Sequence, residues 1–392
     1  MIISPEVAKE KNYLVSVRRH LHKNPELSLK EFATATFIEE QLEAMGIADY
    51  RRIGETGVLA TITGNNGDGK TVLLRADIDA LPVQEETAVS YSSHTDGVMH
   101  ACGHDVHTAA LLGAAKVLQA LHNTFAGQVL LVFQQAEEFG HGSRFFLAEN
   151  VTKNVDRAFG LHVSPDFPVG TIAMVKGADA ASCDYFKINV QGKGAHISKP
   201  HKGIDALYIA SLIVTKLKTL AKEVISPNET ALIGVGKIFS GTSYNIIAEN
   251  AVIEGTTRTF SYDAQELLKQ KIIEVAEQIA IENGGSAVTE FETFTSALIN
   301  HNVAYDEVYR VADKIVGSEN IITDKSFIMG FGSDDFAEYL RETKGVYVHL
   351  GTADPENEET RNPLHSSKFQ IDEQSLLIGA SLHINYVLSI LK

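Results

Sequence analysis

The region between residues 71 and 133 decides the fold, with TVLLR at 71–75, HDVHTAALLGAAKVLQAL at 104–121 and QVLLVF at 128–133. The first and last runs are short, apolar and rich in β-branched residues, as strands buried on both faces of a sheet are. Two further runs of this kind lie at 58–63 and 157–163. Because the middle run predicts a helix, strands and helices alternate, and we expect a layered α/β domain.

The pattern changes near residue 180. A half-buried strand at 183–190 begins a series that predicts the order βαββαβ, a ferredoxin-like α+β unit. Helices and short apolar strands resume after about residue 297. We therefore predict an α/β layered catalytic domain, residues 1–179 and 297–392, with an inserted α+β domain at 180–296. The inserted elements are expected at 183–190, 205–220, 231–238, 251–258, a helix capped by Asp263, and 287–294.

Local signals suggest how some of these elements begin and end. Ser28 and Glu31 have the spacing of a capping box before a helix. The stretch from Gly64 to Thr71 matches the phosphate-loop pattern G-x-x-x-x-G-K-[ST]. That loop needs a helix after its last residue, whereas Thr71 opens an apolar strand. We therefore predict a hairpin turn of Asn and Gly here.

Composition limits the function classes. The 392 residues suggest two or three domains at ~150 residues each. The charge is 34 − 50 = −16, with no cluster of Lys and Arg, which excludes nucleic acid as an expected partner. The beginning of the chain lacks signal-peptide features, and no apolar run reaches the ~18 residues of a membrane span. We expect a cytoplasmic protein whose two cysteines are reduced.

Candidate metal ligands concentrate in MHACGHDVHT at 99–108, where Cys102 and His104 are two residues apart. Thiolate and imidazole bind divalent transition metals, although a buried Cys beside surface histidines gives the same pattern. Glu137 and Glu138 end another apolar strand, where adjacent side chains point in opposite directions. One glutamate could bind metal while the other faces substrate; a solvated acidic loop is the alternative.

Three further segments add possible ligands: Asp77 and Asp79 after a strand, His162 near a strand end, and His365 far along the chain. A single histidine of this kind is more often a hydrogen-bonded core residue. Together, however, one Cys, several His and several carboxylates belong to strand ends or loops of one α/β domain. This combination fits a hydrolase in which two metal ions share a bridging ligand and activate water.

These motifs, in this order over essentially the whole chain, resemble the M20 metallopeptidase family. The likeness is greatest to its aminoacylase/amidohydrolase branch, which includes hippurate hydrolases, indole-acetyl-amino-acid hydrolases and N-acetyldiaminopimelate deacetylases. The resemblance implies a zinc-peptidase-like catalytic domain and an inserted lid and dimerisation domain. The matching motifs are RADIDALPV, HACGHDVHTAALLGAA, QQAEE, GLHV, GKGAHISKPHKGIDAL, NIIAENAVIEGTTRTF, GSDDF and PLHSSKF.

The resemblance also implies roles for individual residues of the catalytic domain. Cys102 stands where much of the family has a metal-bridging Asp, and Glu137 matches the general base. Asp79 matches the acid that orients a metal-side group. Asp77 takes the position of a ligand His in other branches, so the roles of Asp77 and Asp79 stay partly interchangeable. The remaining metal ligands by this match are His104, Glu138, His162 and His365.

In the inserted domain, the resemblance makes His196 the residue that approaches the scissile carbonyl, often from a partner subunit. Asn245 and Arg258 match positions that hold a substrate carboxylate, and the planar fork of arginine suits that task. From the residues alone, His196 could equally be a loop histidine and Arg258 a surface residue. We expect no metal ligation by the other histidines of these segments, although His107, one turn after His104, could support the site.

We therefore predict a metal-dependent amidohydrolase that cleaves N-acyl amino acids of the acetyl or benzoyl type into amino acid and carboxylic acid. Two divalent ions per subunit (Mn, Zn, Co or Ni) are expected, because these donors accommodate any of them. The predicted partner is a small N-acyl amino acid or short peptide, and the predicted assembly is a homodimer or homotetramer. A metallo-dipeptidase or aminopeptidase is the first alternative, and a catalytically silent binding protein is the second.

Overall fold

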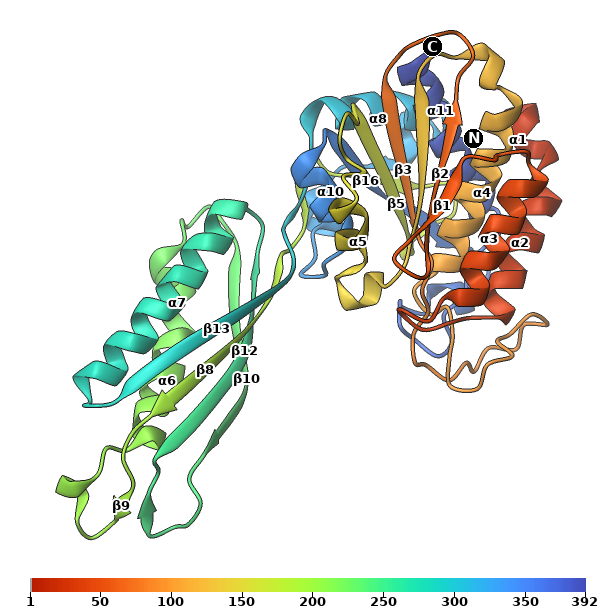
Figure 1. Ribbon diagram of the computed structural model, residues 1–392. Coiled ribbons are helices and arrows are strands. Elements are labelled where there is room, and N and C mark those ends of the chain that lie inside the picture. Colours follow the sequence, from red (N-terminus) through yellow and green to blue (C-terminus); the bar gives the residue numbers. More distant parts are fainter. Residues whose placement is uncertain (1) are drawn as a thin grey trace. The chain divides into compact units, whose positions relative to one another are not determined.

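The computed structural model describes residues 2–392, which form two compact units (Figure 1). The first unit contains the chain up to Asp179, Ile299–Met329 and Asp334–Lys392. The second, here called the inserted unit, contains Ala180–Leu298 and Gly330–Ser333. The short segment Gly330–Ser333 thus joins the inserted unit although the surrounding chain belongs to the first.

Within residues 2–392, the first unit contains a sheet of eight strands in the order β1-β2-β4-β3-β5-β16-β6-β15. Its centre is parallel, because β3 pairs in parallel with β4 and β5, and β5 with β16. The strands are β1 (Tyr50–Ile53), β2 (Gly57–Thr63), β3 (Thr71–Asp77), β4 (Gln128–Gln134), β5 (Arg157–Pro168), β6 (Ile172–Ala173), β15 (Ile321–Ile322) and β16 (Gly345–Ala353). A separate pair consists of β7 (Gly177–Ala180) and β14 (Leu298–Asn300).

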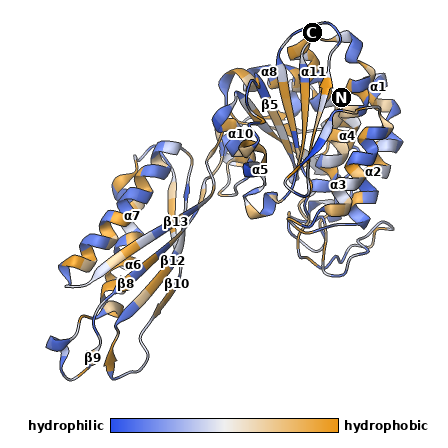
Figure 2. Cartoon of the chain, in the orientation of Figure 1, coloured by the Kyte–Doolittle hydropathy of each residue, from blue (hydrophilic) through white to orange (hydrophobic). Residues whose placement is uncertain are grey.

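Helices cover both faces of this sheet, and the strands are mostly hydrophobic (Figure 2). Along β3, Val72 and Leu74 join the main core, which includes residues of α4 and α11, while Arg75 points to the other face and lies near Phe336 of α10. The helices are α1 (Pro5–Lys9), α2 (Lys11–Lys23), α3 (Phe32–Ala44), α4 (His104–Ala120), α5 (Gly142–Ala148), α8 (Asn302–Val316), α9 (Lys325–Ile328), α10 (Phe336–Glu342) and α11 (Ser375–Leu391). Short 3₁₀ turns are η1 (His122–Thr124), η2 (Glu137–Phe139), η4 (Ser318–Asn320) and η5 (Glu358–Arg361).

The inserted unit has the predicted order βαββαβ. Its four antiparallel strands lie in the order β10-β12-β8-β13, and buried residues of α6 and α7 complete a second core. A small ribbon of β9 and β11 pairs His196 with Ile246. The elements are β8 (Cys183–Gln191), β9 (Ala195–His196), η3 (Pro200–Lys202), α6 (Ala206–Val224), β10 (Ala231–Ser240), β11 (Ile246–Ile247), β12 (Asn250–Thr259), α7 (Tyr262–Glu282) and β13 (Ser286–Thr295).

The predicted fold class, an α/β layered domain interrupted by an α+β unit, is therefore confirmed. Three local predictions are wrong. Residues 64–70 do not form a hairpin turn, because β4 lies between β2 and β3 and pairs with both. Ser261, not Asp263, caps α7, since its hydroxyl accepts the N–H of Ala264.

The third wrong prediction is the capping box of Ser28 and Glu31. Helix α3 begins at Phe32, and Glu31 precedes it without a side-chain capping bond. Ser28 instead donates to Asp79 at 2.6 Å, and Glu31 accepts from Thr56 at 2.8 Å. Both polar side chains are thus used in tertiary contacts, and this is why the local motif misleads.

The part of the chain that the structure describes contains no helix long and apolar enough to cross a membrane. Both cysteines are free, with Cys102 buried and Cys183 partly exposed. The cytoplasmic location stays a prediction.

Candidate functional site

The carboxyl ends of the parallel strands bring most of the predicted ligands together in the first unit. Cys102, His104 and His162 form one group of donors, and Cys102, Glu138 and His365 form another. In each group the ligand atoms all lie within 4.8 Å of one another. Because the two groups share Cys102, the geometry can hold two metal ions with the Cys102 sulfur between them.

A glycine makes the close approach of these segments possible. Gly103 separates Cys102 from His104 and has φ +83°, the left-handed region that glycine adopts without strain. A Cβ atom at this position would lie 2.4 Å from Cγ2 of Val163. Only glycine therefore lets the start of α4 pack against β5, which carries His162.

The ring of His104 is oriented by Asp79. Its Nδ1 donates to the Asp79 carbonyl at 2.9 Å and lies 3.2 Å from the Asp79 carboxylate. Its Nε2 is buried and has no hydrogen-bond partner within residues 2–392. Carboxylate oxygens of Asp77, Glu138 and Glu137 lie 3.8, 3.9 and 4.0 Å from that nitrogen. A buried lone pair among carboxylates is a position suited to a cation.

The pKa of His104 reflects the same surroundings. Burial lowers the pKa, but the carboxylates of Asp77, Asp79 and Glu138 outweigh burial and raise it to about 10. Without a metal ion, a proton on Nε2 is therefore the cation that this cluster holds. A divalent ion can replace that proton and neutralise more of the negative charge.

His162 and Cys102 complete the buried side of the cluster. The His162 Nδ1 donates to the Val163 carbonyl at 2.7 Å, which leaves the Nε2 lone pair 3.4 Å from the Cys102 sulfur. Burial lowers the pKa of His162 well below its usual value. Burial, together with the charges of Glu138 and Glu137, raises the pKa of the Cys102 thiol well above its usual value. A thiolate here requires a bound cation.

The two glutamates lie on a turn held by carboxylates from elsewhere in the chain. Ala136 has φ +53°, an unusual value for a residue other than glycine, and its N–H donates to Glu31 at 2.9 Å. The next two N–H groups, of Glu137 and Glu138, donate to the Asp79 carboxylate at 3.2 and 3.1 Å. Asp79 thus fixes both His104 and the glutamate turn, and His104 and the Ser28 hydroxyl lower the pKa of Asp79 against the effect of burial.

Glu137 lies in an unusually acidic and buried environment. Its side chain is about a tenth exposed, and its carboxylate oxygens lie within 4.8 Å of those of Asp334 and Asp335. Burial and the charges of Asp334, Glu138 and Asp335 raise the pKa of Glu137 well above its usual value. A carboxyl group whose pKa is raised by burial and neighbouring charges is a candidate general base and acid.

One guanidinium organises the carboxylates behind Glu137. Arg75 is 1% exposed and donates to Asp77 at 2.5 Å, to Asp335 at 2.9 Å and to Asp334 at 3.4 Å. Gln134 bridges the Arg75 Nε and the Asp335 carboxylate. Burial raises the pKa of Asp335 to about 7 despite Arg75, with Asp334 adding to the increase. Arg75, Asp334 and Asp335 are not among the site residues predicted from the sequence.

His365 belongs to the more open side of the cluster. Its φ of +66° turns the loop, and its N–H donates to the Ala101 carbonyl at 2.8 Å. The side chain is 54% exposed, and its Nε2 lies 3.4 Å from the Glu138 carboxylate. Interaction with Glu138 raises the pKa of His365. In one donor group Cys102 and His104 are buried and His162 is partly exposed, while the other group reaches solvent through His365.

His196, Asn245 and Arg258 belong to the inserted unit, and the structure does not bring all three together. His196 and Asn245 lie close, since Ile197 donates its N–H to the Asn245 carbonyl. Arg258 lies near the other end of β12, which starts at Asn250. Eight residues at about 3.3 Å each separate Arg258 from Asn250 by roughly 26 Å. His196 and Arg258 of one inserted unit therefore cannot contact the same small substrate.

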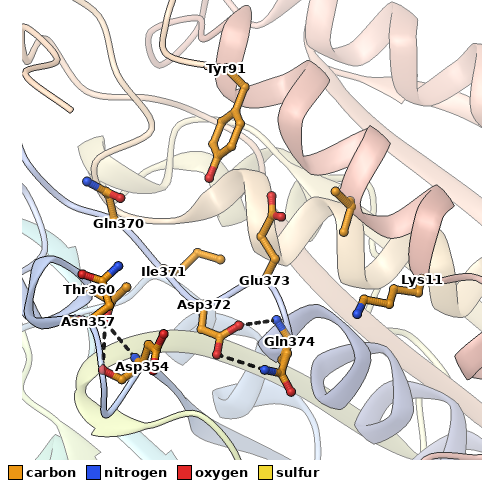
Figure 3. Close-up of a pocket in the computed structure, with 11 residues that line it drawn as sticks. Lys11, Tyr91, Asp354, Asn357, Thr360, Gln370, Ile371, Asp372, Glu373 and Gln374 are labelled. Atoms are coloured by element: carbon orange, nitrogen blue, oxygen red, sulfur yellow. Dashed lines mark hydrogen bonds between the residues drawn. The ribbon is translucent and has the colours of Figure 1, made fainter. Parts of the chain in front are cut away.

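A surface pocket of about 380 Å³ in the first unit contains none of the predicted site residues (Figure 3). Its walls include Tyr91, Asp354, Asp372 and Glu373. Asp372 accepts from the backbone and side chain of Gln374. This pocket therefore lies apart from the Cys, His and Glu donors at the strand ends.

An α/β layered unit that gathers Cys, His and Glu at strand ends is the architecture of a metal-dependent hydrolase. Residues 73–389 match the model of peptidase family M20/M25/M40, and the chain belongs to this family. The predicted resemblance and enzyme class, a hydrolase of amide bonds, are thereby confirmed.

Three similar proteins illustrate the relationship. The chain is 38% identical to an N-acetyl-L-cysteine deacetylase of Bacillus subtilis, over 93% of this chain and 85% of that protein. It is 37% identical to thermostable carboxypeptidase 2 of Saccharolobus solfataricus, over 96% and 95%. The crystal structure of the Bacillus subtilis YXEP protein, described as a dinuclear metal-binding peptidase, superposes with a TM-score of 0.83 at 32% identity, over 97% and 99%.

Proposed function

We propose that this protein is a metal-dependent amidohydrolase that cleaves N-acyl amino acids into amino acid and carboxylic acid. The observation that carries the proposal is the pair of donor groups sharing Cys102, with Glu137 beside them. The N-acetyl-L-cysteine deacetylase at 38% identity supports an N-acyl amino acid as substrate. The acyl group is of the acetyl or benzoyl type.

Two divalent ions (Mn, Zn, Co or Ni) would fit the donors, and Cys102 would be shared by both donor groups. His104 and His162 would hold one ion, and Glu138 and His365 the other. When bound, the ions polarise the substrate carbonyl and lower the pKa of a water molecule. The unpartnered Nε2 of His104 and the thiol of Cys102, which is neutral without a cation, support this assignment.

Glu137 is the proposed general base and acid. Its raised pKa suits it to take a proton from the attacking water and to deliver that proton to the leaving amine. Asp79 orients the site, because it hydrogen bonds His104 and the N–H groups of both glutamates. Asp77 instead bonds Arg75 and His107, so we assign it a supporting role.

His196 is the proposed donor to the oxyanion. The backbone N–H of Ser198 donates to its Nδ1 at 3.1 Å, so the neutral ring carries its proton on Nε2. An exposed Nε2–H can donate to the oxygen on which charge develops.

Asn245 and Arg258 are the proposed ligands of the substrate carboxylate. Asn245 precedes β12 and Arg258 lies near the far end of that strand, and this separation favours contributions from two copies of the chain to each site. We therefore propose a homodimer, or a homotetramer built from it, in which residues 180–296 form a lid and dimerisation domain on a catalytic domain of residues 1–179 and 297–392.

The proposal is tested by metal analysis followed by a screen of N-acyl amino acids with the metal found. We expect metal-dependent release of the free amino acid from acetyl or benzoyl substrates. The carboxypeptidase at 37% identity favours peptide cleavage as a second candidate. Preference for dipeptides over acetyl and benzoyl substrates would replace our proposal by that candidate. If the metal-loaded protein hydrolyses none of these substrates, the protein is a catalytically silent binding protein.

A further inference from the structure

Each of the two backbone polar groups of Val163 in β5 is hydrogen bonded by one histidine. Its N–H donates to His107 Nε2 at 2.9 Å, and its carbonyl accepts from His162 Nδ1 at 2.7 Å. Strand β3 pairs with β5 only as far as the Arg75 and Gly160 pair. Beyond that pair, histidines rather than β3 satisfy the backbone polar groups of Val163, while β16 continues along the other edge of β5.

The ring of His107 is itself held by Asp77 and, through Asp77, by Arg75. Because its Nε2 accepts the N–H of Val163, its Nδ1 carries the proton and donates to Asp77 at 2.5 Å. The other oxygen of Asp77 accepts from Arg75, also at 2.5 Å. These three side chains are at most 1% exposed. Both ring nitrogens of His107 are therefore used, and neither lone pair is available to a metal ion.

We propose that His107 is a positioning residue for the metal position formed by Cys102, His104 and His162. It fixes the backbone of Val163 through its N–H, and the carbonyl of the same residue sets the tautomer and orientation of the His162 ring. The His162 Nε2 lone pair is thereby aimed toward Cys102. Outer hydrogen bonds of this kind typically contribute about 10- to 100-fold to metal affinity. The inference rests on the proposed metal-dependent function.

Two amide variants separate the hydrogen bonds of His107. In His107→Gln, the amide oxygen can reach the position of Nε2 and accept the Val163 N–H. In His107→Asn, the shorter amide can replace Nδ1 toward Asp77 but leaves the Val163 N–H without an acceptor. We expect His107→Asn to weaken one of two metal-binding steps by about 10- to 100-fold and His107→Gln to change it only a few-fold.

The measurement is titration of the metal-free full-length protein with Co²⁺ against a competing chelator, with the cobalt–thiolate absorption reporting Cys102. His365→Gln is the matched control and should weaken the other step. Unchanged affinity in His107→Asn, or equal losses in both His107 variants, overturns the inference. A Co²⁺ spectrum of His107→Gln that shows one metal ligand fewer than the wild type also overturns the inference, because His107 would then bind metal.

Nitrogen-15 spectra of the wild-type metal-free protein supply a test that needs no variant. Both His107 and His162 should carry their protons on Nδ1, and a proton on the Nε2 of neutral His107 would overturn the inference even if a variant fails to fold. A wild-type protein that binds no Co²⁺ would reject the proposed function and the inference together. Two-step binding that no His107 variant alters would reject only the inference.

Discussion

Histidines in the two units have different backbone groups beside their Nδ1 atoms. In the first unit, the Nδ1 atoms of His104 and His162 face the carbonyls of Asp79 and Val163. In the inserted unit, the Nδ1 of His196 faces the N–H of Ser198. A carbonyl only accepts and an N–H only donates, so the two environments select different neutral tautomers.

This difference separates the proposed metal ligands from the proposed hydrogen-bond donor. In their neutral forms, His104 and His162 have an Nε2 lone pair, which a metal ion needs, whereas His196 has an Nε2–H group. Burial adds to the contrast, because His104 is fully enclosed and His196 is exposed. One side-chain type therefore serves two chemical roles, according to the backbone group beside its Nδ1.

The largest effect should come from substituting, one at a time, the two adjacent glutamates beside the proposed metal ligands of the first unit. We expect Glu137→Gln to lower the rate of amide hydrolysis by about two to four orders of magnitude, because a general base is lost. Its metal content should stay normal. Glu138→Gln should lose metal first, since Glu138 faces Cys102 and His365. Hydrolysis assays and metal analysis of both purified variants provide the measurement.

The control for this pair is circular dichroism, which should match the wild type in both variants. If the two variants bind metal normally and hydrolyse substrate at equal rates, the assignment of a base and a ligand is wrong.

The second prediction tests the donor role of His196. His196→Ala should lower the rate constant for hydrolysis by about 10²- to 10³-fold, as loss of an oxyanion donor does. His196→Gln should restore part of that loss, because its amide can place an N–H near the position of Nε2. Neither variant should change metal content. Loss of metal on changing His196 would show that its Nε2 carries a lone pair and would contradict the tautomer inferred here.

The sequence predicted the order of elements and the donor residues, but not the long-range contacts behind them. Alternating strands and helices are local patterns, so the α/β and βαββαβ arrangements could be read directly. The position of β4 between β2 and β3 depends on pairing between distant segments and contradicted the predicted hairpin. Similarly, Arg75 reaches Asp335 across 260 positions of sequence. The motifs RADIDALPV and GSDDF contain Arg75, Asp334 and Asp335, but nothing in the sequence indicates that the two segments meet.

Ser28 and Glu31 show why even a strong local motif can fail. The spacing predicted two bonds within one helix turn, yet Glu31 accepts the Ala136 N–H and Ser28 donates to Asp79. Both contacts support the turn that carries Glu137. A short-range pattern cannot reveal that a distant segment will compete for the same polar atoms.

A third prediction extends the comparison to His383, a buried histidine beside Phe159 whose nitrogens have no hydrogen-bond partner within residues 2–392. Burial lowers its pKa to about 3. Between pH 6.5 and 3 the unfolded chain therefore binds a proton that the native protein does not, and this group makes the free energy of unfolding fall as the pH falls. From pH 8 to pH 5 the contribution is about 2 kcal/mol.

His383→Leu should remove that contribution while keeping a similar volume. Urea denaturation at pH 8 and pH 5 gives the free energy of unfolding of both proteins at each pH. The wild type should lose about 2 kcal/mol more than the variant between the two values. Equal losses would show that His383 is protonated or hydrogen bonded in the native protein.

The smallest effect is expected at Ser198, which holds His196 by two hydrogen bonds. The backbone N–H donates to Nδ1 at 3.1 Å, and the hydroxyl lies 2.7 Å from the same nitrogen. Ser198→Ala removes only the hydroxyl, so the backbone N–H continues to select the Nε2–H tautomer. A neutral hydrogen bond contributes about 0.5–1.5 kcal/mol, and the rate should fall roughly 2- to 12-fold with little change in KM. A loss as large as that of His196→Ala would show that the hydroxyl, rather than the backbone, determines the tautomer of His196.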